Sequence, residues 1–229
     1  EGGRDYNTVE ISPSTRHNVY LPPFKAGVDA GAAMVMPSFN LVDGVSSAAS
    51  PYVLQTLLRQ ELGFDGVIVS DYAAVVETID HGLAQDGREA ALRCANAGLD
   101  IEMATDLFNR ELPRLVMEVK VPEAIIDGAV LRILALKYRL GIMDDPYLYM
   151  HEGEEKAVYL APEHLETARC LARESCVLLK NDGALPLKEG AKIALVGPCA
   201  DSKDQLGPWQ FSAFKERTVT LRQGLEERG

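Results

Sequence analysis

The chain has 229 residues, of which 47% are hydrophobic and 25% are charged, a composition typical of a soluble globular protein with one large domain or two small ones. Its formal net charge of −11 argues against nucleic acid and anionic membranes as partners. No apolar run is long enough to span a bilayer, and the opening residues do not resemble a signal peptide.

Cysteine usage gives no sign of a metal site. The chain contains Cys94, Cys170, Cys176 and Cys199, no two of them with the C-x-x-C spacing, and only four histidines. We therefore expect buried free thiols, with Cys170 and Cys176 on one helix, and no structural zinc. Unpaired cysteines slightly favour the cytoplasm, but a secreted or periplasmic location stays open.

The N-terminal part of the chain predicts two helices with a strand between them. The first helix covers 12–30, where the pair Pro22-Pro23 is expected to break or kink it. The apolar run 32–39 predicts a buried strand. The second helix covers 50–62, with its apolar side chains on one face, and a glycine ends it.

Residues 61–72 read ELGFDGVIVSDY and form the stretch around which the chain is organised. The β-branched run Val67–Val69, flanked by glycine turns, is typical of a strand buried on both faces in a parallel sheet. Asp71 follows at the C-terminal end of this strand, where parallel-sheet enzymes keep their catalytic groups. In the alternative interpretation, Asp71 only caps the helix that comes next.

A third strand and three further helices follow. The strand is predicted at 98–103, and the helices at 86–97, 107–119 and 122–140. Strands about thirty residues apart, each followed by a helix, predict the βα units of a parallel sheet or barrel. Three units are too few for an eight-stranded barrel, so the sheet is open or the chain is part of a barrel.

The pattern changes in the last third of the chain. Residues 144–162 are charged and aperiodic and are interpreted as a linker between domains. An amphipathic helix is predicted at 164–179, a buried strand at 192–196 and a possible strand at 218–221. The strand at 192–196 ends in Gly-Pro, which favours a tight turn over a phosphate loop. The only tryptophan, Trp209, lies in the final stretch.

Five segments in order resemble glycoside hydrolase family 3, the family of β-glucosidases and β-xylosidases. The segments are MVMPSFN with Asp43-Gly44, GFDGVIVSDY, AGLDIEM, ARESCVLLKNDGALPL and IALVGPCAD. The second resembles the nucleophile segment of the family, in which a strand ends in Ser-Asp followed by Trp, Tyr or His. The resemblance covers the whole chain.

The resemblance implies an α/β fold in two parts. Residues 1–143 would be the C-terminal part of a (β/α)8 TIM-like barrel, carrying its last three strands and their helices. Residues 144–162 would be the linker, and 163–229 the beginning of an α/β/α sandwich. The earlier strands, with the Lys-His pair and the Arg and Asp that hold sugar hydroxyls, would precede Glu1, and the acid/base Glu would lie beyond Gly229.

The resemblance also assigns site residues. A retaining glycosidase uses two carboxyl groups, one of which attacks the anomeric carbon. Asp71 would be this nucleophile. Tyr72 would stack on a sugar ring, with ordinary packing as the alternative. Phe39 would lie beside the reacting sugar without the hydroxyl that a Tyr would offer. Met103 would line the same pocket, although core packing is an equal alternative.

Other polar residues near these segments are given weaker or no roles. Arg4 and Asp5 follow the missing sugar-binding segment and could touch substrate, but a surface role is favoured. Glu102 is not expected to be the acid/base, because it points to the opposite side of its strand from Met103 and the family gives it no catalytic role. Asp80 and His81 are interpreted as a solvated helix end.

The function expected from these residues is retaining hydrolysis of a β-linked glucoside or oligosaccharide, with no metal or organic cofactor. β-Xylosidase activity is the alternative within the family. A second hypothesis is an inactive fragment that folds by association, because open sheet edges favour a homo-oligomer or a complementing chain. An unrelated α/β sugar- or nucleotide-binding domain is a third and weaker one.

Overall fold

The structure is a computed structural model that describes residues 6–207 and 215–228. The chain divides into two compact units, Glu1–His151 and Glu152–Gly229, and each is described by itself. This boundary lies inside the segment 144–162 that was interpreted as a linker. Arg4, Asp5 and Trp209 lie outside the described residues.

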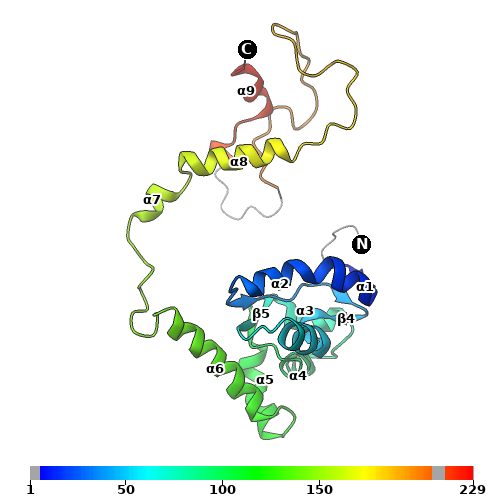
Figure 1. The fold of residues 1–229 in the computed structure, drawn as a ribbon, viewed down its shortest axis with the longest axis vertical. Coiled ribbons are helices and arrows are strands. Elements are labelled where there is room, and N and C mark those ends of the chain that lie inside the picture. The colour runs from blue at the N-terminus through cyan, green and yellow to red at the C-terminus, as the bar shows by residue number, and fades with distance from the viewer. Residues whose placement is uncertain (1–5, 208–214, 229) are drawn as a thin grey trace. The chain divides into compact units, whose positions relative to one another are not determined.

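The first unit alternates strands and helices along the chain (Figure 1). In order, the elements are β1 Thr8–Val9, α1 Pro13–Thr15, the π-helical turn η1 Arg16–Tyr20, α2 Leu21–Asp29, β2 Met34–Val35, β3 Leu41–Val42, β4 Val45–Ser46, the 3-10 turn η2 Ser47–Ala49, the π-helix η3 Tyr52–Glu61, β5 Val67–Tyr72, α3 Ala74–Asp80, α4 Gly87–Ala97, β6 Ile101–Met103, α5 Leu107–Met117 and α6 Glu123–Arg139.

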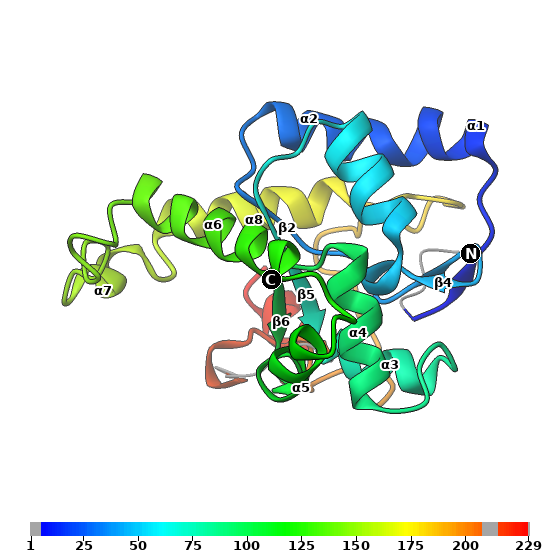
Figure 2. The same cartoon turned by 90° about the horizontal axis from the view of Figure 1, so that it is seen from below.

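The main sheet consists of β2, β5 and β6, in that order and all parallel (Figure 2). All three predicted strands are present and pair in parallel, but two are shorter than predicted: the run 32–39 forms a strand only at Met34–Val35, and the stretch 98–103 only at Ile101–Met103. The prediction that 32–39 is buried was wrong, because β2 has a strand neighbour on one side only among the described residues and Met34 and Met36 are exposed. Ile68 of β5 belongs to the core cluster that also contains Leu54 and Leu58 of η3 and Ala91 of α4. Because side chains alternate along a strand, the buried Val67 lies on the opposite face. Both faces of β5 are thus covered, as its apolar run predicts.

The helix at 12–30 changes type instead of breaking. A π-helical turn at Arg16–Tyr20 precedes α2, and Pro22 and Pro23 lie in the first turn of α2. Proline is tolerated there because the first N–H groups of a helix have no partner within it. The predicted helix 50–62 also forms, as the π-helix η3.

A second small sheet consists of β1, β3 and β4. In it β1 pairs with β3 in parallel, and β3 pairs with β4 as a hairpin. The hairpin turn is Asp43-Gly44, both with positive φ, as a two-residue type I′ turn requires. The carboxylate of Asp43 pairs with the buried guanidinium of Arg16, which also donates to the hydroxyl of Tyr52 at 3.0 Å and to the carbonyl of Ile11 at 3.2 Å. Arg16 therefore links η1, η3 and the hairpin.

A buried carboxylate joins four elements around the start of β5. The side chain of Asp100 is 1% exposed. It accepts hydrogen bonds from Arg59 of η3 at 2.8 Å, from the main-chain N–H of Ile68 at 2.8 Å and from Arg132 of α6 at 2.6 Å. Arg59 also donates to the carbonyl of Gly66, just before β5. Burial lowers the pKa of Arg59, and the charge of Asp100 opposes that shift.

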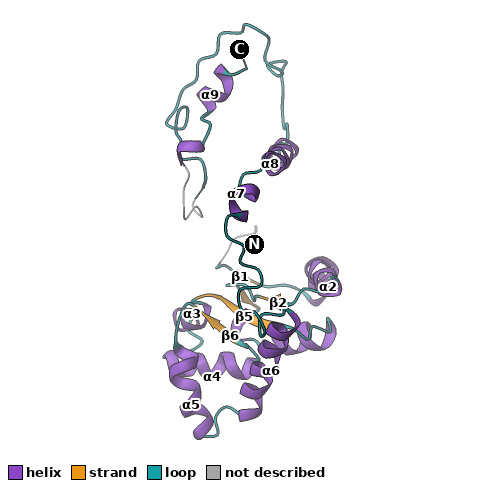
Figure 3. Ribbon diagram, turned by 90° about the vertical axis from the view of Figure 1, so that its left-hand side faces the viewer, coloured by secondary structure: helices purple, strands orange, loops and turns teal. Residues whose placement is uncertain are grey.

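The second unit contains helices and, among its described residues, no strand (Figure 3). Its elements are α7 Glu154–Val158, α8 Pro162–Glu174, the 3-10 turn η4 Lys215–Arg217 and α9 Leu221–Glu226. The predicted helix 164–179 was too long, because α8 ends at Glu174 and the residues after it are irregular, with Leu179 91% exposed.

Both strands predicted in this unit were wrong. Residues 192–196 are irregular and leave Ile193 and Val196 exposed, since the described residues supply no neighbouring strand with which they could pair. The possible strand at 218–221 leads into α9 instead. Thr220 caps this helix by accepting from the N–H of Gln223, whose side chain accepts from the N–H of Thr220.

Only one of the four cysteines fits the expectation of buried thiols. Cys94 is buried, and burial raises its pKa to about 12. Cys176 and Cys199 are exposed, and Cys170 is half-buried, because α8 packs few of its side chains and ends before Cys176. Within the described ranges, no group of His, Cys, Asp and Glu side chains could hold a metal ion, and no helix is long and apolar enough to cross a membrane.

The ion-pair network predicts a large stability effect at one position. Asp100→Ala would leave the partly buried Arg59 without its carboxylate partner and the buried N–H of Ile68 without the acceptor it has in the parent. We expect the free energy of unfolding to fall by about 3–5 kcal/mol, measured by urea unfolding. The control is Asp29→Ala, which breaks an exposed pair with Lys25 and should cost less than about 1 kcal/mol. Equal losses in the two variants would contradict the role of Asp100.

Candidate active site

The carboxyl end of β5 carries a β-bulge at the predicted nucleophile. Pairing with β6 is regular up to Val69 and resumes at Tyr72, with a shift in register between them. Ser70 and Asp71 therefore oppose a single residue of β6, Glu102. Such bulges bend a strand and redirect its side chains, and they are common next to active sites.

Ser70 fills the gap that the bulge opens. Its side chain is fully buried. The main-chain N–H of Met103 donates to Ser70 Oγ at 2.8 Å, and the Ser70 hydroxyl donates to the carbonyl of Asp71 at 2.8 Å. The hydroxyl thus bridges β6 and the main chain of the residue that carries the carboxylate.

Asp71 is half-buried and does not cap helix α3. Its Oδ1 accepts from the main-chain N–H of Tyr72 at 2.7 Å. The N-cap of α3 is Ala73, which has a left-handed backbone and makes no side-chain capping bond. The capping interpretation of Asp71 was therefore wrong, and its carboxylate is held by a neighbouring peptide at the strand end.

The other predicted site residues lie in different surroundings. Tyr72 is 67% exposed. Met103 is half-buried, lies at the end of β6 and pairs with Tyr72. Phe39 follows β2 and is 7% exposed, with its ring stacked on Tyr6 at a centroid distance of 4.3 Å. The parallel sheet brings Asp71, Tyr72 and Met103 together at the carboxyl end of its strands, while Phe39 is mainly packed against another aromatic ring. Their roles toward a substrate stay predictions.

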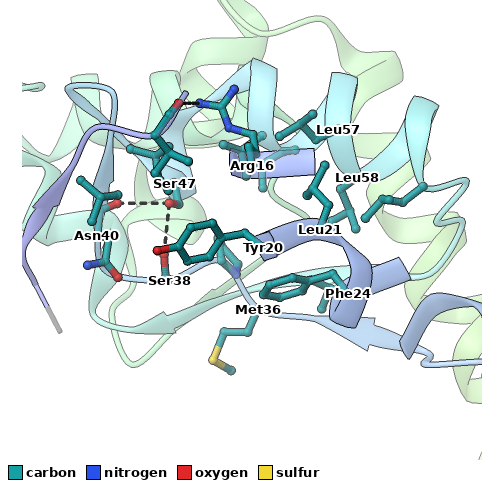
Figure 4. Close-up of a pocket in the computed structure, with 18 of the residues that line it drawn as sticks. Arg16, Tyr20, Leu21, Phe24, Met36, Ser38, Asn40, Ser47, Leu57 and Leu58 are labelled. Carbon is teal, nitrogen blue, oxygen red and sulfur yellow. Dashed lines mark hydrogen bonds between the residues drawn. The ribbon is translucent and has the colours of Figure 1, made fainter. Parts of the chain in front are cut away.

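A cavity of about 680 Å³ lies beside the carboxyl end of the sheet, between η1, α2, η3 and β2 (Figure 4). Asp71 is part of its lining. Most of the lining is aliphatic or aromatic, including Leu21, Phe24 and Leu57. Its serines already bond to their neighbours, since Ser47 donates to the carbonyl of Asn40 at 3.1 Å and lies 3.2 Å from the hydroxyl of Ser38. Apart from Asp71, this cavity offers few polar groups for sugar hydroxyls.

Ser38, Asn40 and Ser47 of this lining were not among the site residues predicted from the sequence. Ser38 is the last polar residue within the strand that was predicted at 32–39, and Asn40 follows directly after it, where polar side chains are a recognisable signal. Ser47 gave no such signal, because the hairpin that returns it to the same place depends on the turn at Asp43-Gly44.

Glu102 holds the start of helix α5. Its Oε2 accepts from the main-chain N–H of Phe108 at 2.7 Å, and its Oε1 accepts from the hydroxyl of Thr105. Burial raises the pKa of Glu102, against the lowering effect of the main-chain N–H groups of Phe108 and Leu107. Both oxygens are therefore engaged in local structure. Asp80 is exposed and His81 half-buried at the end of α3.

Parallel βα units with a carboxylate at the carboxyl end of the central strand define an α/β domain of the barrel type. The model "Glycosyl hydrolase family 3 N terminal domain" matches residues 1–136, and "Glycosyl hydrolase family 3 C-terminal domain" matches residues 176–229. The chain therefore belongs to glycosyl hydrolase family 3. The resemblance read from the motifs and the expected α/β fold class are both confirmed.

The similar proteins and solved structures include β-glucosidases and a putative β-xylosidase. The chain is 40% identical to a periplasmic β-glucosidase of Salmonella typhimurium, over 99% of this chain and 30% of that protein. It is 35% identical to a putative β-xylosidase of Formosa agariphila, over 86% and 26%. A crystal structure of a mutant β-glucosidase from Listeria innocua in complex with laminaribiose matches with a TM-score of 0.87 and 41% identity, over 99% and 32%. The chain thus spans between about a quarter and a third of the length of these proteins.

The raised pKa of Glu102 predicts the pH dependence of a variant. A carboxyl whose pKa is raised on folding contributes stability below its ordinary pKa, and this contribution is lost as the pH rises through the folded value. Glu102→Gln resembles the protonated acid at every pH. We expect its free energy of unfolding, relative to the parent, to improve from about pH 4 to about pH 7.

Thermal or urea unfolding at several pH values measures this effect. The control is Glu10→Gln, which changes an exposed carboxyl and should show no such trend. A relative stability of Glu102→Gln that falls with rising pH would mean that the N–H donors, not burial, control this carboxyl.

Proposed function

We propose that this chain supplies the nucleophile of a retaining β-glucosidase, and that Asp71 is that nucleophile. The observation that carries the proposal is the position of Asp71, at the bulged carboxyl end of the central strand of the parallel sheet. Membership of the family and the β-glucosidase names among its relatives support the reaction.

In the proposed reaction, a carboxylate oxygen of Asp71 attacks the anomeric carbon of a β-glucoside. The bond to the leaving oxygen breaks as a second carboxyl group protonates it, and a covalent glycosyl-enzyme ester forms. Water, deprotonated by that second group, then hydrolyses the ester and releases the sugar with its original configuration. The reaction needs no organic cofactor or metal ion.

We place the acid/base outside these 229 residues. Glu102 is the nearest acidic residue to Asp71 across the sheet, but both its oxygens hold the start of α5. A group with this structural role cannot also reach a leaving oxygen without giving up that contact. The outer strands β2 and β6 each have one strand neighbour among the described residues, and a complementing chain or a second copy would add strands at these two edges.

A glucoside is favoured over a xyloside as the substrate. The Listeria innocua structure contains laminaribiose, and several relatives carry β-glucosidase names, while others carry β-xylosidase names. The two sugars differ by one hydroxymethyl group, which a pocket distinguishes by shape and hydrogen bonds. The exposed ring of Tyr72 offers a flat surface for the apolar face of either sugar.

The first test concerns the nucleophile. The chain is assayed alone and in place of the matching segment of the Listeria innocua β-glucosidase, which supplies the rest of the barrel. We expect the chimera to hydrolyse an aryl β-D-glucoside, and Asp71→Asn to lower its kcat by about three orders of magnitude or more.

Two controls accompany this assay. Asp80→Asn changes an exposed carboxylate on the helix after the strand and should leave kcat within about twofold. An aryl β-D-xyloside tests the alternative substrate, and faster turnover of that compound would replace the glucoside in the proposal. Turnover by Asp71→Asn at a tenth of the parent rate or more would contradict the proposed nucleophile.

The second test concerns the aromatic ring beside Asp71. Removal of a stacking partner worth about 0.5–1.5 kcal/mol should raise KM by about two- to twelvefold in Tyr72→Ala. Tyr72→Phe keeps the ring and should remain within about twofold of the parent. Steady-state kinetics with the aryl glucoside measures both variants, and an equal KM in the two would show that the ring does not contact the sugar.

A further inference from the structure

The residue before the proposed nucleophile, Ser70, has a polar side chain at a buried strand position. β5 begins with three buried apolar residues, and the next one, Ser70, is just as buried but polar. A buried hydroxyl without partners would destabilise the fold, so its hydrogen bonds account for its presence. One joins Ser70 to the carbonyl of Asp71, and the other joins Ser70 to the N–H of Met103 on the neighbouring strand.

Met103 secures the main chain on both sides of Asp71. Before Asp71, the N–H of Met103 donates to Ser70 Oγ at 2.8 Å, because the bulge has displaced the main-chain ladder there. After Asp71, the carbonyl of Met103 accepts from the N–H of Ala73 at 3.1 Å. One residue of β6 therefore fixes the peptide segment that carries the carboxylate, and only the first of the two contacts depends on a side chain.

We propose that Ser70 is a positioning residue, whose hydroxyl fixes the bulge and thereby the direction of the Asp71 carboxylate. This inference rests on the proposed function of Asp71. Without the hydroxyl, the N–H of Met103 loses its acceptor and the Asp71 carbonyl loses its donor. The bulge can then relax, and the carboxylate moves away from the line of attack. A displacement of about 1 Å at a reacting group can cost about 100-fold in rate.

The effect should appear in kcat and not in KM, because Ser70 is fully buried and does not contact the sugar. In the chimera, we expect Ser70→Ala to lower kcat by about 10- to 100-fold and to leave KM within about threefold. Ser70→Thr keeps the hydroxyl on a strand-favouring side chain and should recover most of kcat. Ser70→Cys has a similar size but a much weaker donor and acceptor, and should behave like Ser70→Ala.

A matched control separates positioning from the general loss of a buried hydroxyl. Ser50 is also buried, and its Oγ accepts from the N–H of Val53 at 3.3 Å, a hydrogen bond that involves neither β5 nor β6. Ser50→Ala should leave kcat within about twofold, although it also removes a local hydrogen bond. If Ser70→Ala does not fold, Ser70→Cys takes its place in the comparison, because it leaves no cavity.

Amide hydrogen exchange in the 229-residue chain tests the hydrogen bond from the Met103 N–H to Ser70 without an activity assay. We expect the N–H of Met103 to exchange faster in Ser70→Ala than in the parent, while that of Ala73 changes less. Exchange of the Met103 N–H at the parent rate would overturn the bridge. A kcat of Ser70→Ala or Ser70→Cys within twofold of the parent would overturn the positioning role.

The failures of the two proposals are distinguishable. Retained turnover in Asp71→Asn would refute the nucleophile, whatever Ser70 does. Loss of turnover in Asp71→Asn combined with normal turnover in Ser70→Ala would refute the positioning role alone.

Discussion

The carboxylate of Asp100 fixes how β5 and β6 pair, and the site at the far end of β5 depends on that pairing. Asp100 accepts from the N–H of Ile68 and donates its own N–H to the carbonyl of the same residue at 3.0 Å. Arg59 and Arg132 hold the carboxylate from two helices. A slip of one residue would turn every side chain of β5 to the other face, so this contact decides that Asp71 reaches the strand end in its present orientation.

The two ends of β5 are held by different chemistry. Charged groups fix the beginning of the strand, where desolvation is costly and removing one partner would leave another buried charge. Neutral hydrogen bonds through Ser70 and Met103 fix its end, close to the carboxylate. Among the described residues, the Asp71 carboxylate accepts a hydrogen bond from the N–H of Tyr72 alone, which leaves its second oxygen available for chemistry. β5 is thus anchored by ion pairs near its start and carries the proposed nucleophile at its end.

Sequence patterns predicted most of the first unit, because its strands and helices are buried on defined faces and their apolar periodicity is strong. They could not reveal the bulge, because an extra residue in a strand leaves no periodic signal. The Asp100 network joins residues 41 and 32 positions apart, a separation that only the fold closes. In the second unit, the apolar run 192–196 looked like a strand, but strands also need a neighbour, which no local pattern supplies.

The most direct test of this account is to identify the residue that becomes glycosylated. A 2-deoxy-2-fluoro-glucoside with a good leaving group slows hydrolysis of the glycosyl-enzyme and allows it to accumulate. Proteolysis and mass spectrometry of the trapped chimera then locate the sugar. The account predicts a label on the peptide that contains Asp71 and on no other peptide of this chain. A label on another carboxylate, with Asp71 unmodified, would contradict it.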